Sequence, residues 1–395
     1  MKYCIVIADG VAGAAADELD GRTPLDAANT PNFDRASMLG RQGTLQTVPE
    51  GMEPAAGMAV LSILGVDPAA NYTGLGPLEA AGLDIELGPA DVAFRCNLVT
   101  VADGRMLDVT AGDIRQAEAS ALIDAITERL ATADVSFRHG AGYQNLMVYS
   151  GREDVSAKCI PPQEILGEEV ANSMPRGPGE TLLRGLIERS AAALEAHDVN
   201  LVRIDHGESP ATMIWLWGGG KAAGIQPFAE QFGKTGAVVS ASNAVKGIAK
   251  NLALSCVDIK GGPGEPDTNR AAMAEAAISS LDTHDLAVLH VAAAGEGGDA
   301  LGAAGRIRTI EDIDGQIVGR ILDALLGQAD ARVLIAAGRG AHAAIRAGAR
   351  QPIPFAMCGA GVRPVHELAF SEKSAAGTGL TIEHGHELMA YFLRE

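Results

Sequence analysis

The order of apolar and helical segments is the feature that most restricts the fold of this chain. Short, continuous apolar runs alternate with Ala- and Leu-rich stretches of helical composition. Such runs are typical of parallel strands that helices cover on both faces. The expected strands are residues 4–8, 238–241, 256–259, 286–291 and 333–336, and the expected helices include 180–197, 243–251, 269–281 and 310–326. The chain is therefore predicted to form an α/β core with a doubly wound, mostly parallel sheet.

Residues 91–174 have a different pattern. Four short apolar runs surround a single helical stretch, with strands expected at 94–101, 135–139, 143–150 and 158–160 and the helix at 114–130. Successive strands around one helix indicate a small α+β domain. We therefore expect a cap of residues 91–174 inserted into a discontinuous core of residues 1–90 and 175–395.

Composition narrows the classes of function. The formal charge of −19 at pH 7 disfavours binding to nucleic acid or to anionic membranes. No apolar run reaches the roughly 18 residues of a membrane-spanning helix, and the first ten residues indicate a strand rather than a signal peptide. Five scattered cysteines suggest neither a disulfide framework nor a CxxC metal site, so we expect a reducing, cytoplasmic setting.

Several longer motifs carry a resemblance that covers nearly the whole chain. They are DGVAGAAADELDGRTPLDAANTPNFDRAS (9–37), YTGLGPLEAAGL (72–83), DVAFRCN (91–97), WLWGGGK (215–221), IEDID (310–314), PIPF (352–355) and GHELM (385–389). In this order they resemble the archaeal-type cofactor-independent phosphoglycerate mutases of the alkaline-phosphatase superfamily. The resemblance implies an alkaline-phosphatase-like core and an isomerase of glycolysis that interconverts 3-phosphoglycerate and 2-phosphoglycerate.

The resemblance also implies a catalytic apparatus, most of which this sequence lacks. Family members hold two divalent ions, of the manganese or zinc class, at the carboxyl ends of the strands, where the ions activate a nucleophilic serine. Asp9 matches the first metal ligand, but Ala56 stands at the position of the serine. The remaining ligand positions, which the family fills with Asp or His, are occupied by Gly295, Asp299, Gly338, Arg339 and Gly348.

Most of the positively charged residues that the family uses to bind its substrate are also missing from this sequence. Arginines that the family uses to grip phosphate are missing from the motifs at residues 74–76, 108–113 and 143–145, and Met273 replaces a family lysine. Arg95 and Lys221 remain as candidate substrate-binding residues. Arg95 could equally form an ion pair between domains, Lys221 could be a solvated surface cation, and Asp9 could cap a turn without any metal.

Other residues of the retained motifs have structural interpretations. We expect His290 and His386 to be buried core histidines, Arg203 to be solvated, and at least one of Trp215 and Trp217 to be buried. The glycines of WLWGGGK are expected to allow close approach of another backbone segment.

These observations lead to three hypotheses. The first is a protein that has lost the ancestral chemistry, needs no cofactor, and binds a small phosphorylated or carboxylate ligand or a protein partner. The second is an active mutase or related phosphotransferase whose rebuilt manganese or zinc site draws on Asp9, Glu296, Asp299 and His342, with Ser62 as the nearest hydroxyl. The third is a regulatory subunit of an intact paralogue.

Overall fold

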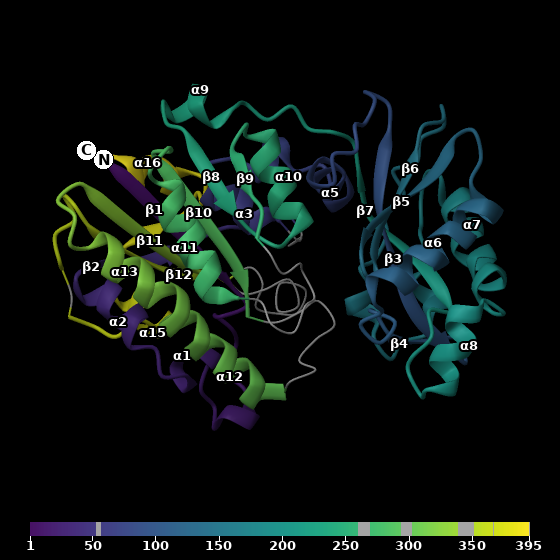
Figure 1. The fold of residues 1–395 in the computed structure, drawn as a ribbon, viewed down its shortest axis with the longest axis horizontal. Coiled ribbons are helices and arrows are strands. Elements are labelled where there is room, and N and C mark those ends of the chain that lie inside the picture. Colours follow the sequence, from purple (N-terminus) through teal and green to yellow (C-terminus); the bar gives the residue numbers. More distant parts are fainter. Residues whose placement is uncertain (53–56, 260–268, 294–301, 339–350, 366, 395) are drawn as a thin grey trace. The chain divides into compact units, whose positions relative to one another are not determined.

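The computed structural model describes residues 1–52, 57–259, 269–293, 302–338, 351–365 and 367–394, and the chain forms two compact units (Figure 1). Unit 1 comprises Met1–Tyr72 and Gly224–Glu395, and unit 2 comprises Thr73–Ala223. Unit 2 therefore extends beyond the predicted cap of residues 91–174 at both ends. In the described residues, no helix is both long and apolar enough to span a membrane.

Unit 1 is built on an eight-stranded sheet, as the alternation of strands and helices predicts. The strand order is β13 (Thr381–Ile382), β2 (Gly40–Leu45), β12 (Ile353–Gly359), β11 (Ala331–Ala337), β1 (Lys2–Asp9), β10 (Leu286–Ala292), β8 (Gly236–Val239) and β9 (Ser255–Val257). All neighbouring strands pair in parallel except β12, which is antiparallel to both β11 and β2. The fold is thus mixed α/β with a large, mostly parallel sheet.

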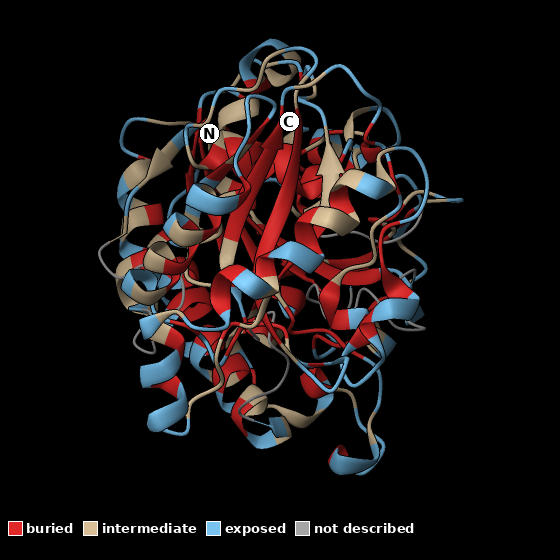
Figure 2. Cartoon of the chain, turned by 90° about the vertical axis from the view of Figure 1, so that its right-hand side faces the viewer, coloured by how far each residue is buried: buried red, intermediate tan, exposed pale blue. Residues whose placement is uncertain are grey.

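Strand β1 lies in the middle of this sheet and is buried on both faces. Cys4, Val6 and Ala8 pack into an apolar cluster with residues of the helices on one face. On the opposite face the ring of Tyr3 packs edge-on against Phe392, with 5.5 Å between the ring centroids. Because both faces of the strand are buried, its sequence is a continuous apolar run. Figure 2 shows buried residues along the strands.

The helices of unit 1 connect and cover these strands. They are α1 (Pro24–Ala27), α2 (Pro31–Met38), α3 (Met58–Ile63), α4 (Pro68–Asn71), α9 (Phe228–Phe232), α10 (Asn243–Asn251), α11 (Arg270–Ser280), α12 (Gly302–Ile313), α13 (Arg320–Leu325), α15 (Glu372–Gly377) and α16 (Glu387–Leu393). A π-helical segment, Asp314–Gly319, joins α12 directly to α13.

The IEDID motif anchors the start of α2. The buried carboxylate of Asp314 accepts hydrogen bonds from the backbone N–H groups of Asn32 (3.0 Å) and Phe33 (2.8 Å), and Glu311 accepts one from Asn29 (3.0 Å). The Asp314 carboxylate thereby satisfies donors that the first turn of a helix leaves unpaired, and Glu311 fixes the residue before the N-cap. Burial raises the pKa of the Asp314 carboxyl above its ordinary value, and the hydrogen bonds oppose that shift. The motif is therefore a structural anchor.

Unit 2 has an antiparallel sheet whose long central strand is β3 (Val92–Ala102). Around it lie β4 (Arg105–Asp108), β6 (Gln144–Tyr149), β5 (Val135–Ala141) and β7 (Met213–Gly220), with helices α5 (Leu75–Gly82), α6 (Gln116–Leu130), α7 (Glu180–Leu194) and α8 (Asp198–Asp205). The strand expected at 158–160 is reduced to one isolated bridge between Lys158 and Arg176. Because β7 pairs with β3, residues 175–223 belong to this unit rather than to the core.

Glycines allow α5 to lie directly on strands β3 and β7. A Cβ atom on Gly76 would stand 2.2 Å from the carbonyl oxygen of Ala93, and one on Gly220 would stand 2.3 Å from that of Thr73. A Cβ on Gly219 would be 2.2 Å from Cε1 of Phe94. The prediction that WLWGGGK provides close backbone approach is confirmed, and both tryptophans are buried.

Replacing Gly76 with Ala tests this packing. The added methyl group meets backbone that cannot rotate away, so Gly76→Ala is expected to lower the free energy of unfolding by about 1–3 kcal/mol. Gly185→Ala is the matched control, since Gly185 is also helical and its nearest neighbour is the end of the Arg189 side chain at 4.0 Å. That substitution should stabilise unit 2 by roughly 0.5–1 kcal/mol.

Urea unfolding followed by tryptophan fluorescence measures both variants, because the two tryptophans of the chain lie in unit 2. Equal stability changes in the two variants would contradict the close approach of α5.

Candidate functional site

The carboxyl ends of β1, β10 and β11 lie side by side at one edge of the large sheet. Asp9 is the last residue of β1 and is paired in register with Ala292 of β10, while Ala8 is paired with Ala337 of β11. This edge is where parallel α/β proteins place ligands. Two of the predicted metal positions, Asp9 and Gly338, are described here. The other positions named from the sequence lie outside the described residues, namely Ala56, Gly295, Glu296, Asp299, Arg339, His342 and Gly348.

Gly338 lies against the carboxylate of Asp9. Its N–H donates to the carbonyl of Ala8 (2.9 Å), and its own carbonyl accepts from the N–H groups of Gly10 and Ala12 (3.0 Å each). A Cβ atom at position 338 would stand 2.5 Å from Oδ1 of Asp9. In the conformation seen here, the carboxylate fills the space beside position 338, and it would have to rotate to make room for a side chain there.

His290 of β10 faces the same carboxylate. Its Nε2 atom lies 3.9 Å from Oδ2 of Asp9, and its Nδ1 atom lies 3.1 Å from the hydroxyl oxygen of Ser240. That hydroxyl also accepts a hydrogen bond from the N–H of Ser242 (3.1 Å). The prediction that His290 is buried is confirmed, with 8% of its surface exposed. Its contact with Asp9 could not be predicted from the sequence, because the two residues are far apart in the chain.

Asp9, His290 and Ser240 are the three residue types of a hydrolytic triad. Their solvent exposure, however, is the reverse of that in such a triad. In such a triad the serine is open to substrate and the carboxylate is buried. Here Ser240 is 2% exposed, whereas the side chain of Asp9 is 29% exposed. The arrangement therefore orients His290 toward Asp9 and does not present a nucleophile.

We tested whether these residues suit a pair of divalent ions. Asp9 and His290 bring two donors together, and no group of three His, Cys, Asp or Glu side chains in the described part of the chain is placed to hold an ion. The guanidinium of Arg306 donates to the carbonyl of Gly10 (2.7 and 3.1 Å), so a positive group is fixed beside the β1 turn. A two-metal clamp needs many more ligand atoms, and the described donors do not fit one.

On the substrate side, Arg95 lies inside unit 2. Its Nε atom is 3.1 Å from a carboxylate oxygen of Glu79, and its guanidinium carbon is 5.6 Å from the centroid of the Trp217 ring. Arg95 is 1% exposed, so its guanidinium is not open to a ligand in this structure. The ion pair that the sequence suggested exists, but within one unit rather than between domains. Lys221, the other candidate, is exposed just after β7.

Arg203 contradicts the expectation of a solvated cation. It is 2% exposed and pairs with Glu118 (2.8 Å) and Glu208 (3.1 Å). It also donates to the carbonyl of Ala111 (2.8 Å) in the loop after β4. A buried arginine of α8 thus holds the loop after β4 in place.

Comparisons with known proteins agree with this fold. A family model described as 2,3-bisphosphoglycerate-independent phosphoglycerate mutase matches residues 38–200. The protein named 2,3-bisphosphoglycerate-independent phosphoglycerate mutase 2 of Methanothermobacter thermautotrophicus is 42% identical over 390 residues, which cover 98% of this chain and 96% of the relative. This chain belongs to the cofactor-independent phosphoglycerate mutase family.

Solved structures support the same assignment. The cofactor-independent phosphoglycerate mutase of Thermoplasma acidophilum has a TM-score of 0.58 at 26% identity and covers 100% of this chain and 99% of its own. A Pyrococcus horikoshii protein has a TM-score of 0.75 at 27% identity, covering 99% and 96%. The family resemblance stated from the motifs is therefore confirmed.

Two further positions named from the sequence are buried in unit 1. Met273, where the resemblance implies a lysine, is 1% exposed and packs in the apolar core of unit 1. Ser62, the hydroxyl considered for a rebuilt site, is also 1% exposed and donates to the carbonyl of Thr47 (2.7 Å). Its hydroxyl serves the local packing of α3.

Removing one partner of the buried ion pair tests the structural role of Arg95. Arg95→Leu leaves the carboxylate of Glu79 buried without its guanidinium, and we expect a loss of about 3–5 kcal/mol in the free energy of unfolding. The double variant Arg95→Leu/Glu79→Leu should lose clearly less, because no charge is left uncompensated. Urea titration followed by tryptophan fluorescence provides the values. A single variant as stable as the parent would show that Arg95 is free for another role.

Proposed function

We propose that this protein is a family member that has lost two-metal phosphoryl transfer and keeps the fold to bind a ligand or a protein partner. The observation that carries the proposal is the contact between Asp9 and Gly338. The carboxylate that matches the family's first metal ligand lies against a glycine, which supplies no second ligand atom, and its Oδ1 stands 2.5 Å from the position that a Cβ at residue 338 would take.

The replaced residues support the same conclusion. Ala56 has a methyl group where a phosphoryl acceptor is required, and a methyl group cannot form the covalent intermediate. Glycine at positions 295, 338 and 348 supplies no ligand atom, and Arg339 would repel a cation. With these changes, phosphoryl transfer lacks both its nucleophile and its Lewis acid.

The arginines of unit 2 also support the proposal that this protein binds a ligand other than the family's substrate. Bidentate arginines grip phosphate strongly, and the arginines of unit 2 discussed above, Arg95 and Arg203, are buried in ion pairs. Lys221 is the exposed candidate that remains. A small phosphorylated or carboxylate ligand would therefore have to be bound by residues other than the phosphate-binding arginines of the family. We propose that this binding takes place in a reducing, cytoplasmic setting, which the five free cysteines suggest.

An active mutase with a rebuilt site is the second candidate. It is favoured by the 42% identity to a relative named as a mutase and by the approach of His290 to Asp9. Against it stands Ser62, whose buried hydroxyl would have to leave the carbonyl of Thr47 to accept a phosphoryl group.

Metal analysis and a coupled assay separate the two candidates. The purified protein is expected to contain far less than one manganese or zinc ion per chain. Its conversion of 3-phosphoglycerate to 2-phosphoglycerate should be at least about a thousand-fold slower than that of the Thermoplasma acidophilum mutase prepared in the same way. Ala56→Ser restores the hydroxyl but no metal ligand, and it should remain inactive. Two ions per chain together with turnover would overturn the proposal.

A further inference from the structure

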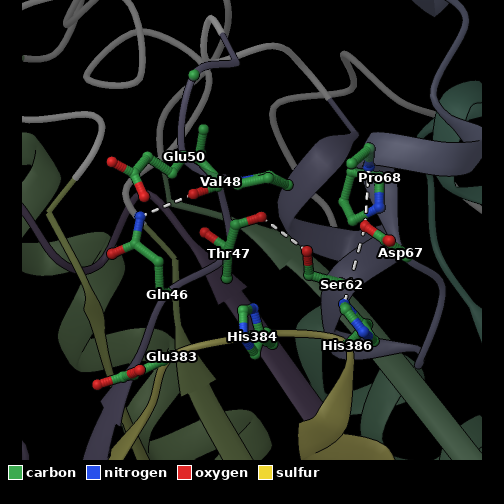
Figure 3. A pocket seen from close by; sticks show the side chains of 14 residues that line it. Gln46, Thr47, Val48, Glu50, Ser62, Asp67, Pro68, Glu383, His384 and His386 are labelled. Carbon is green, nitrogen blue, oxygen red and sulfur yellow. Dashed lines mark hydrogen bonds and ion pairs between the residues drawn. The ribbon is translucent and has the colours of Figure 1, made fainter.

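A cavity of about 590 Å³ lies in unit 1, beyond the carboxyl end of β2 (Figure 3). His386, expected from the sequence to be a core histidine, instead lines this cavity with 34% of its side chain exposed. Its Nδ1 atom lies 3.9 Å from Oδ1 of Asp67, which caps the start of α4 by accepting from the N–H of Ala69 (2.9 Å). These contacts give both residues a structural role, and we assign no ligand to the cavity.

Helix α8 of unit 2 has its polar residues inside and its apolar residues outside. Asn200 and Arg203 are each 2% exposed, whereas Leu201, Val202 and Ile204 are 47%, 53% and 54% exposed. A surface helix of a soluble domain ordinarily has the opposite pattern, with its apolar stripe against the core. We call Leu201, Val202 and Ile204 the α8 face.

Hydrogen bonds fix this orientation of α8. Asn200 donates through Nδ2 to the carbonyls of Leu194 (2.9 Å) and Ala211 (2.7 Å), and its Oδ1 accepts from the N–H of Ala211 (3.0 Å). Arg203 is held by the ion pairs described above. Rotating the helix to bury its apolar side would leave these polar groups without partners. The α8 face can therefore be removed from water only by another surface.

A second exposed apolar surface lies on unit 1, where the end of α2 meets the segment after β12. Four large apolar side chains are exposed there, namely Met38, Leu39, Val365 and Leu368. The two segments are joined, because the N–H of Val365 donates to the carbonyl of Gly40 (3.2 Å) and the hydroxyl of Ser37 donates to the carbonyl of Leu368 (2.9 Å). Clustered apolar side chains of this kind mark interaction surfaces. We call these four residues the α2 patch.

Acidic residues flank the α8 face. Asp198 and Asp205 are exposed, and each lies three or four residues from Leu201 and Val202, so they share one side of the helix. If two copies paired through α8 in antiparallel fashion across a two-fold axis, Asp198 of one would lie beside Asp205 of the other. Like charges would then meet at both ends of the contact. The charges therefore disfavour pairing of α8 with its own copy.

Basic residues border the α2 patch. Nε of Arg41 donates to the carbonyl of Arg363 (3.3 Å), and the side chain of Arg363 is exposed. Glu367 is exposed in the same segment and offsets one of these charges, while Arg35 at the end of α2 is paired with Asp323. The edge formed by Arg41 and Arg363 is therefore positive, which is the charge that complements the two ends of the α8 face.

We propose that the α8 face docks on the α2 patch of a second copy of this chain, with Asp198 and Asp205 beside Arg41 and Arg363. The contact joins two different surfaces, so copies associate head to tail into a ring or a filament. The inference goes beyond the proposed loss of phosphoryl transfer. It concerns self-association alone and stands whether or not that loss is demonstrated.

Sedimentation velocity of the full-length protein at about 0.15 M ionic strength tests the proposal, over concentrations from about 1 μM to about 1 mM. We expect the weight-average sedimentation coefficient to rise with concentration. Leu201→Gln/Ile204→Gln and Val365→Gln/Leu368→Gln should each raise the Kd of association roughly ten-fold or more, because each removes two apolar side chains from one of the two surfaces.

Leu107→Gln/Leu166→Gln is the matched control, since both leucines are exposed in unit 2 and belong to neither surface. This variant should keep its Kd within about two-fold of the parent value. All of the substituted side chains are exposed, so the variants are expected to fold as the parent does. A protein that stays monomeric at every concentration, or equal weakening in the control, would overturn the proposal.

A charge swap distinguishes this contact from pairing of two α8 helices. Asp205→Arg and Arg363→Glu should each raise the Kd by about three-fold or more, because each places like charges across the contact. Asp205→Arg/Arg363→Glu in one chain should return the Kd to within about two-fold of the parent value, since opposite charges face each other again. Tighter association of Asp205→Arg alone would indicate α8–α8 pairing, and that result or a failure of the double variant to recover would contradict the proposal.

Discussion

The contact between the Asp9 carboxylate and Gly338, at the ends of two neighbouring parallel strands, is the constraint on which the functional account depends. Because β1 and β11 run side by side in fixed register, their last residues must meet. In a two-metal enzyme these positions would direct two ligand groups at shared ions. Here one position is a glycine, the carboxylate lies against it, and the imidazole of His290 faces the carboxylate from β10. The proposed loss of phosphoryl transfer depends on this arrangement at the edge of the sheet.

The retained motifs have structural explanations that do not require activity. Asp314 holds the start of α2 through backbone N–H groups, and the glycines of α5 and β7 let backbone segments approach within contact distance. Changes at such positions would leave buried donors unpaired or force backbone apart. Such structural roles can keep a chain recognisable over nearly its whole length, with 42% identity to a relative named as a mutase, whether or not it is active.

Much of the fold could be predicted from the sequence because buried parallel strands have a strong local signature. The strands next to β1 were found, whereas β2, β12 and β13 at one side of the sheet were not assigned. The extent of unit 2 depends on the pairing of β7 with β3, which are more than a hundred residues apart. Arg203 and His386 were misjudged for the same reason: carboxylates from α6 and the loop after α8 bury the arginine, and a cavity exposes the histidine. Local patterns do not reveal such distant partners.

The central claim of the proposed function is that this protein holds no pair of divalent ions beside Asp9. Its most direct test is anomalous diffraction from crystals of the protein soaked with manganese and 3-phosphoglycerate. The account predicts no pair of manganese peaks near the ends of β1, β10 and β11. Two peaks about 3.5–4 Å apart and within bonding distance of Asp9 would contradict it.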